Sequence, residues 1–378
     1  MSEFQPAKRL RGIEKSMIRQ LFDRALPGSI NLGLGEPDLL TPLVVRRAAA
    51  RVVMEEHNGY TSHAGLPALR ELIAAQYAHT EAKPERVIVT AGSQEALYLA
   101  LMTLVDEGDE VLLPDPGFVA YPTIVRMAGG RPVFYRLPAA LDFGFDADEF
   151  RRSITPRTKV AVCISPSNPT GRTLARDDLA VMSEALAGTN AFVISDEIYR
   201  DLYYTAERPA SISDTYARTL VIGGLSKSMS MTGWRIGWLC GDEDVMRSAL
   251  ILHGYVTTCA STVTQKAALE AAWTDEAEEA RAQMRATFHE RRDHLLALIR
   301  EQKGWRAVAP DGAFYTMVRT GAEMDSLMVA EKMLAHGVIT VPGAAFGSEG
   351  EGYLRVSFCA EKSVLTEGVR RMSQALAQ

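Results

Sequence analysis

The stretch 223–238, GGLSKSMSMTGWRIGW, places Lys227 and Arg235 among serines, glycines and apolar residues and contains no acidic side chain. A lysine amine can form an imine with a carbonyl compound, which makes it a possible covalent catalyst. An arginine binds phosphate or carboxylate through a planar fork that reaches two oxygens at once. The segment therefore predicts a site built around an amine and an anion.

The whole chain has the composition of an ordinary globular enzyme. Its 378 residues are 47% hydrophobic and 23% charged, with a formal net charge of −6. This length predicts two or three domains, and the mixed charge argues against a nucleic-acid-binding surface. No apolar run reaches the length of about 18–20 residues that spans a bilayer. The polar N-terminus lacks the apolar core of a signal peptide.

Cysteine usage indicates a reducing compartment. Cys163, Cys240, Cys259 and Cys359 are scattered, without a CxxC pair or a neighbouring pair of histidines. We interpret them as free thiols and expect neither a metal site nor a disulfide framework. The expected location is the cytoplasm.

Short apolar runs alternate with helical patterns from about residue 86 onward. The runs expected as buried strands are 86–90, 110–114, 132–137, 159–165, 191–196, 219–224 and 235–241. Helical patterns at 94–105 and 176–187 lie between some of them. This alternation predicts an α/β core with a largely parallel sheet. The gap between Gly224 and Arg235 is too short for a crossover helix, so we expect the last strand to be antiparallel to its predecessor.

The C-terminal part has a different pattern. A long charged helix at 275–302 precedes apolar segments at 312–318, 337–343 and 352–358. A final helix pattern at 363–377 has four apolar residues on one face, Leu365, Val369, Met372 and Leu376. We expect a smaller α+β domain here. The chain is thereby divided into an N-terminal segment 1–40 that packs with the small domain, a large domain 41–280 and the small domain 281–378.

Polar residues follow several of the expected strands at the point where each strand ends. In an open α/β sheet, ligands bind beyond the carboxyl ends of the strands. AGSQEAL, with Ser93, follows one strand and leads into a helix, which favours a phosphate cradle. PSNPTG with Asn168, DEIY with Asp196 and Tyr199, and LSKS with Lys227 follow three others. Taken singly, each motif is equally compatible with a turn or a helix cap.

Taken together and in this order, the motifs resemble the class I/II aminotransferases of the fold-type I pyridoxal-phosphate-dependent enzyme superfamily. The resemblance runs from NLGLGEPD at 31–38 to LRVSF at 354–358, and the set NPTG, SDEIY and SKSMSMTGWRIGW is specific. It implies a large domain with a mostly parallel seven-stranded sheet flanked by helices, plus a smaller α+β domain. It also implies pyridoxal 5'-phosphate as cofactor and a homodimer with shared active sites.

The resemblance assigns a role to each matching residue around the cofactor. Lys227 would hold it as a Schiff base and transfer the proton, and Asp196 would pair with the pyridine nitrogen so that the ring acts as an electron sink. Asn168 and Tyr199 would hydrogen-bond the phenolic oxygen, and Arg235 would bind the phosphate. The other matching positions are Ser93 and Gln94 in the phosphate loop, Ser226 and Ser228 as hydroxyl donors, Phe118 as a stacking ring where many relatives have Trp or Tyr, and Tyr60, which reaches the phosphate across the dimer interface.

The substrate positions also follow from the resemblance. Arg355 matches the arginine that grips the α-carboxylate, and Gly35 and Asn168 match residues beside it. We identify no second arginine dedicated to a side-chain carboxylate, so the preferred amino acid stays open. Glutamate with 2-oxoglutarate is expected as one substrate pair. The segment 253–262 of the neighbouring subunit, together with His63 and Tyr315, is a further candidate to line the pocket.

Three activities are compatible with such a site. The favoured one is transamination between an L-amino acid and a 2-oxo acid in two half-reactions. An elimination enzyme, of the C–S lyase or aminocyclopropane-carboxylate synthase type, uses nearly the same residues. A regulatory protein with an aminotransferase-like domain is disfavoured, because only about 35 residues precede the first core motif.

Overall fold

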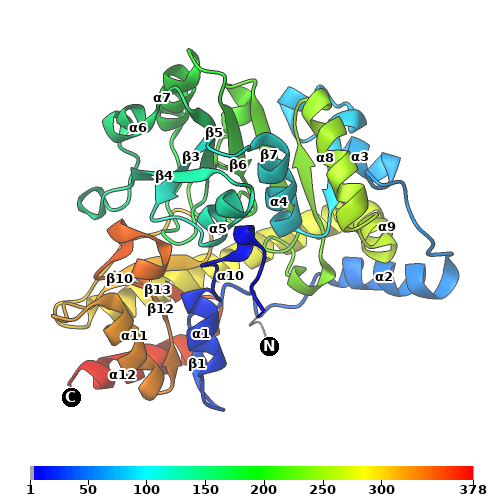
Figure 1. Cartoon of the computed structure of the whole chain (residues 1–378). Coiled ribbons are helices and arrows are strands. Elements are labelled where there is room, and N and C mark those ends of the chain that lie inside the picture. The colour runs from blue at the N-terminus through cyan, green and yellow to red at the C-terminus, as the bar shows by residue number, and fades with distance from the viewer. Residues whose placement is uncertain (1–3, 378) are drawn as a thin grey trace.

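A seven-stranded sheet forms the centre of the chain in the computed structural model, which describes residues 4–377 (Figure 1). The strand order is β2-β8-β7-β6-β5-β3-β4. The strands are β2 (Val87–Thr90), β3 (Glu110–Asp115), β4 (Arg131–Arg136), β5 (Thr158–Ile164), β6 (Phe192–Asp196), β7 (Thr219–Gly224) and β8 (Gly237–Cys240). Only β8 runs antiparallel to its neighbours, β2 and β7. The predicted α/β class and the antiparallel last strand are confirmed.

Helices cover the sheet on both faces, which explains why the strands are continuously apolar. Every residue of β2, β3, β7 and β8 is buried, as expected for a sheet without a solvated face. The covering helices are α2 (Leu43–Glu55), α3 (Pro67–Ala74), α4 (Ser93–Leu104), α5 (Ala120–Met127), α6 (Ala147–Ser153), α7 (Arg176–Leu186), α8 (Glu243–Val256) and α9 (Thr262–Ala271). Half of α4 is buried between the sheet and α8, and its N-terminus is thereby fixed at the sheet edge.

A second, smaller unit contains the C-terminal part of the chain. Its antiparallel sheet has the order β12-β13-β10-β9. The strands are β9 (Arg306–Ala307), β10 (Tyr315–Arg319), β12 (Val341–Pro342) and β13 (Leu354–Ser357), and the helices are α11 (Ser326–Ala335) and α12 (Lys362–Ala377). On α12, Leu365, Val369 and Met372 are buried and Leu376 is half-buried. The predicted apolar face of this helix is therefore confirmed.

The N-terminal segment lies against the smaller unit. Strand β1 (Ile30–Asn31) pairs in parallel with β11 (Val338–Ile339), and the preceding helix α1 (Met17–Asp23) is followed by Arg24, which forms an ion pair with Glu331 at 2.9 Å. Helix α10 (Asp275–Arg300) connects the two units and runs between them (Figure 1). The boundary expected at residues 280–281 falls inside this continuous helix, so the division into domains stays a prediction.

Two predicted absences can be examined in the described part of the chain. Between residues 4 and 377, no helix is long and apolar enough to cross a membrane. The same residues contain no group of three or more His, Cys, Asp or Glu side chains that could hold a metal ion. All four cysteines are free thiols, and Cys259 is the only one that is not buried.

Candidate active site

The strand exits meet at one cavity of about 420 Å³, at the carboxyl ends of β5, β6 and β7. The predicted site residues that line it are Gly35, Ser93, Gln94, Phe118, Asn168, Asp196, Tyr199, Ser226, Lys227, Arg235 and Arg355. They come from segments more than 300 residues apart in the chain. The parallel strands bring Asn168, Asp196 and Lys227 together, because their carboxyl ends lie at the same edge of the sheet, and the N-terminal segment and β13 add Gly35 and Arg355.

Lys227 follows β7 and points its amine into the cavity. Its Nζ donates a hydrogen bond to the backbone oxygen of Gly35 at 2.7 Å, and it lies 5.8 Å from the centre of the Phe314 ring. Burial lowers the pKa of Lys227, because removal from water disfavours the charged ammonium. The site therefore shifts the amine toward its neutral form, which is the nucleophilic and proton-accepting one.

Asp196 lies at the end of β6, and its carboxylate is buried in the cavity wall. Its Oδ2 accepts a hydrogen bond from the Tyr121 hydroxyl at 2.9 Å, and its Oδ1 accepts one from the backbone N–H of Ile198 at 3.2 Å. Both donors are neutral. Burial raises the pKa of Asp196 to about 6, because the hydrogen bonds from Tyr121 and Ile198 and the nearby Lys227 only partly offset the lost hydration. A cationic ligand group beside this carboxylate would supply the missing charge.

At the N-terminus of helix α4, the cavity offers hydrogen-bond donors for an anion. Helix α4 begins here without a side-chain cap, directly after Gly92 at φ +89°. A Cβ atom on Gly92 would lie 2.4 Å from Arg235 Nη2, so only glycine lets the arginine approach the loop. Arg235 donates to the backbone oxygens of Ala91 at 3.1 Å and Thr232 at 2.9 Å. An uncapped helix N-terminus facing an arginine is a phosphate-binding arrangement.

Arg355 on β13 is a buried cation without an acidic partner among the described residues. Only 3% of its surface is exposed. Its Nη1 donates to Asn168 Oδ1 at 2.8 Å and its Nη2 to the backbone oxygen of Gly33, while its buried Nε has no hydrogen-bond partner. The guanidinium lies between the rings of Tyr315 and Phe346, at 4.3 and 4.8 Å. Burying an unpaired charge is costly, and a carboxylate ligand in the cavity would pair it.

Some of the predicted site residues do not line this cavity in the single chain. Tyr60 is one of them. Its side chain is 89% exposed and does not line the cavity, so its place across a dimer interface stays a prediction. Ser228 is buried and does not line the cavity, so its role as a donor to a ligand stays a prediction. His63 and the segment 253–262 are absent from the lining, whereas Tyr315 belongs to it.

Two groups of lining or supporting residues were missed in the sequence. Tyr121 lies three residues after Phe118 in GFVAYP, in helix α5. Nothing in the local sequence indicates that it reaches Asp196 at the end of β6. Helix α1 contributes Ser16, Ile18, Arg19 and Phe22 to the cavity wall. A serine before an apolar run predicts a helix start, and the Ser16 side chain does cap α1. The docking of this helix over the cavity is a tertiary contact that the sequence does not reveal.

Comparison with known proteins agrees with this architecture. Residues 27–372 match the family described as aminotransferase class I and II. The chain is 35% identical to an aspartate aminotransferase of Pyrococcus horikoshii, over 98% of this chain and 97% of that one. It is 32% identical to aromatic-amino-acid aminotransferase 2 of Thermococcus litoralis, over 98% of both chains. The structure of a Thermus thermophilus aspartate aminotransferase with maleate matches with a TM-score of 0.93 at 33% identity, over 99% of this chain and 100% of that one.

The fold is that of a class I/II aminotransferase of fold type I, and the chain belongs to this family. It is an enzyme that transfers an amino group between an amino acid and a 2-oxo acid. The resemblance drawn from NPTG, SDEIY and SKSMSMTGWRIGW is confirmed. Since the family uses pyridoxal phosphate, the chemistry of the donor groups around the cavity can be compared with that cofactor.

Proposed function

We propose that pyridoxal 5'-phosphate binds in this cavity and is carried by Lys227. The observation that supports it is the arrangement of three complementary groups around one space of about 420 Å³. These are a lysine whose burial favours the neutral amine, a buried carboxylate with only neutral donors, and an uncapped helix N-terminus beside Arg235. They suit, respectively, the aldehyde carbon, the pyridine nitrogen and the phosphate of the cofactor. Phe118 lines the same space and offers a ring face for stacking.

When bound, the cofactor supplies a ring that withdraws electrons from the substrate α-carbon. The protein residues then have separate tasks. Asp196 holds the proton on the ring nitrogen, since a carboxylate beside it favours the charged form. Lys227 Nζ would accept the proton from the substrate α-carbon as a general base and, once protonated, would serve as the general acid of the transfer. Tyr199 and Asn168 bind the phenolic oxygen, and Ser93, Gln94, Ser226 and Arg235 hold the phosphate.

Arg355 binds the substrate α-carboxylate in this proposal. Its buried Nε lacks a partner, and a planar guanidinium can bind both oxygens of a carboxylate. Gly35 and Asn168 adjoin the same place, because Asn168 already bonds Arg355 and Gly35 contacts Lys227. Elimination would use the same groups, but the compared proteins described above are named aminotransferases.

We further propose a dicarboxylic amino acid as a preferred substrate, with glutamate and 2-oxoglutarate as one pair. Besides the three basic residues already assigned, Lys227, Arg235 and Arg355, the cavity wall contains Arg19 on α1. Arg19 forms an ion pair with Asp23 at 3.2 Å, and its side chain is 66% exposed. This pair is weak because both partners are solvated, so the guanidinium is available to a second substrate carboxylate.

A homodimer with shared active sites completes the proposal. Large apolar side chains remain exposed in the single chain, among them Met54 at 82% and Tyr255 at 90%. Tyr60 lies on the loop after α2 and is equally exposed. Exposed apolar side chains near such a loop favour a protein interface, which would bring Tyr60 to the phosphate of the neighbouring subunit's site.

Reduction with borohydride tests the cofactor assignment directly. The purified protein with pyridoxal phosphate should be yellow, and reduction should fix the cofactor on Lys227, as read by peptide mass mapping. Lys266, paired with Glu56 at 3.0 Å, provides the matched control: Lys266→Ala should still become labelled and Lys227→Ala should not. An adduct on a different lysine of the wild-type protein would overturn the assignment.

A further inference from the structure

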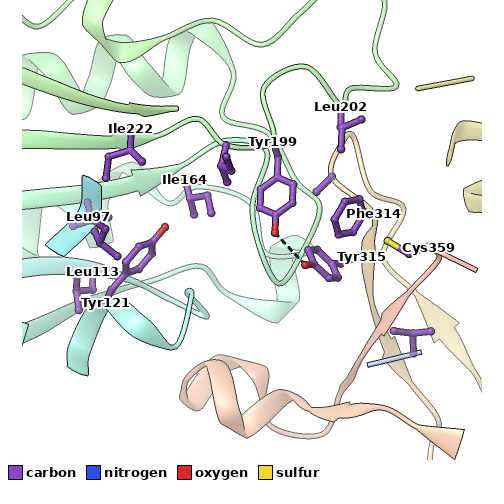
Figure 2. Packing of buried hydrophobic residues seen from close by; sticks show 14 of the residues in the cluster. Leu97, Leu113, Tyr121, Ile164, Tyr199, Leu202, Ile222, Phe314, Tyr315 and Cys359 are labelled. Atoms are coloured by element: carbon purple, nitrogen blue, oxygen red, sulfur yellow. Dashed lines mark hydrogen bonds between the residues drawn. The ribbon is translucent and has the colours of Figure 1, made fainter. Parts of the chain in front are cut away.

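Tyr315 is a buried residue that touches both halves of the cavity. It lies at the start of β10, with 2% of its surface exposed. Its hydroxyl lies 3.0 Å from the Tyr199 hydroxyl, as Figure 2 shows with a dashed line. Its ring lies 4.3 Å from the Arg355 guanidinium. One side chain therefore contacts a proposed cofactor ligand and the proposed substrate ligand.

The position of Tyr315 follows from the register of two antiparallel strands. Tyr315 pairs with Ser357, and Met317 pairs with Arg355. Residues two apart on a strand share a face, so Tyr315 and Arg355 are diagonal neighbours on one face, within reach of long side chains. The ring lies against the flat side of the guanidinium. Nη1 and Nη2 already donate to Asn168 and Gly33, and the unpartnered Nε is left to bind a carboxylate.

Gly35 fixes the hydroxyl end of the same side chain. A Cβ atom on Gly35 would lie 1.5 Å from the Tyr315 hydroxyl oxygen, so only glycine allows this phenol to reach Tyr199. The two hydroxyls can bond in either direction. When Tyr199 donates its proton to a ligand oxygen, its own oxygen is left to accept from Tyr315. The hydrogen-bond chain then runs from Tyr315 through Tyr199 to the ligand.

We infer that Tyr315 is a positioning residue with two separable functions, one for its hydroxyl and one for its ring. The hydroxyl donates to Tyr199 and strengthens the hydrogen bond of Tyr199 to the phenolic oxygen of pyridoxal phosphate, since chains of hydrogen bonds polarise one another. The ring holds Arg355 in the orientation that binds the substrate carboxylate. This inference rests on the proposed cofactor site.

The hydroxyl function is tested with Tyr315→Phe, which keeps the ring. Tyr199 stabilises negative charge on the phenolic oxygen, so weakening its bond should raise the pKa of the yellow chromophore formed with Lys227. From the usual strength of one hydrogen bond, we expect an increase of about half to one pKa unit. The pKa is read from absorbance titration of the bound cofactor without substrate. In a Tyr199→Phe background the same substitution should have no further effect, because Tyr315 acts through Tyr199.

The ring function is tested with Tyr315→Leu, measured with glutamate and with an amine that lacks a carboxylate. Tyr315→Leu should raise the KM for glutamate by about tenfold, as expected when a guanidinium loses its orienting contact, and leave the amine little affected. Tyr315→Phe should leave both KM values near those of the wild type. Thermal unfolding and circular dichroism of each variant show whether it is folded.

Tyr135→Phe is the matched control, since it also removes a buried phenol hydrogen bond, to the Val162 oxygen at 2.9 Å. It should lower thermal stability without moving the chromophore pKa. If Tyr315→Phe likewise leaves this pKa unchanged, the hydroxyl function is wrong. If Tyr315→Leu affects glutamate and the amine alike, the ring function is wrong. A wild-type protein that forms no chromophore would overturn the proposed function itself, which separates the two failures.

Discussion

Asn168 Oδ1 accepts a hydrogen bond from Arg355 Nη1 at 2.8 Å, which joins two buried residues from different sheets. Asn168 follows β5 of the large sheet, and Arg355 belongs to β13 of the small one. Because its oxygen accepts from Arg355, Asn168 is oriented with its NH2 group available to donate to a ligand. In the proposed function this bond joins a ligand of the cofactor to the ligand of the substrate carboxylate, and separate substitutions can distinguish the two roles.

Arg355→Ala should reduce kcat/KM for every amino-acid substrate by about 10²-fold or more, because truncating one partner of a buried charge pair costs about 2–5 kcal/mol. The absorbance of the bound cofactor should stay close to normal. An amine without a carboxylate is the internal control and should be little affected. Equal losses for glutamate and the amine would show that Arg355 is structural.

Asp196→Asn should impair proton removal from the substrate α-carbon far more than it weakens cofactor binding. The amide cannot hold the ring nitrogen in its charged form, a preference of about 1.4 kcal/mol for each pKa unit. Single-turnover rates and cofactor dissociation constants measure the two effects. Small, equal changes in both would reduce Asp196 to a structural carboxylate.

In the cofactor-free enzyme, Asp196 should contribute a loss of stability as the pH rises from about 4 to about 6. Burial raises the pKa of Asp196 from 3.8 to about 6 in the folded chain, so the folded state keeps a proton that the unfolded state has released. This group alone should lower the free energy of unfolding by about 3 kcal/mol across this window. Urea unfolding at several pH values measures it. Asp196→Asn should remove this component of the pH dependence, and an unchanged profile would contradict the assignment.

Gly92→Ala should weaken binding of pyridoxal phosphate, measured as its dissociation constant, while the chain still folds. Gly92 has φ +89°, and a Cβ would lie 2.4 Å from Arg235 Nη2. The substitution strains the backbone by about 1 kcal/mol and displaces the proposed phosphate ligand. Gly188→Ala is the control, since its Cβ would meet no atom within 4 Å. Equal cofactor affinity in both variants would contradict the proposed cradle.

Arg19→Gln should selectively raise KM for dicarboxylic substrates. Loss of a partly solvated charge pair costs about 1 kcal/mol or somewhat more, so we expect about a five- to tenfold increase for glutamate and little change for alanine. Arg24→Gln, next to the same helix but paired with Glu331, is the matched control. An equal effect of Arg19→Gln on glutamate and alanine would show that α1 only covers the cavity.

Much of the site could be predicted because its residues stand at strand exits. Apolar runs and helical periods define the strands, and parallel pairing then places Asn168, Asp196 and Lys227 at one edge of the sheet. These relationships depend on local pattern and on a general property of α/β sheets. The strand ends differ from the expected ones by two residues or fewer; β8, for example, begins at Gly237, after Arg235 at φ +54°.

The sequence by itself determined the fold class, the family and many of the residues that line the cavity. Only the tertiary structure decided how these residues are supported. Three examples involve residues far apart in the chain. Tyr121 donates a hydrogen bond to Asp196, and Tyr315 contacts Arg355. Arg19 lines the same cavity as the strand-exit residues. Such contacts depend on strand register and helix docking, which are set by packing of the whole core and leave no local pattern in the sequence.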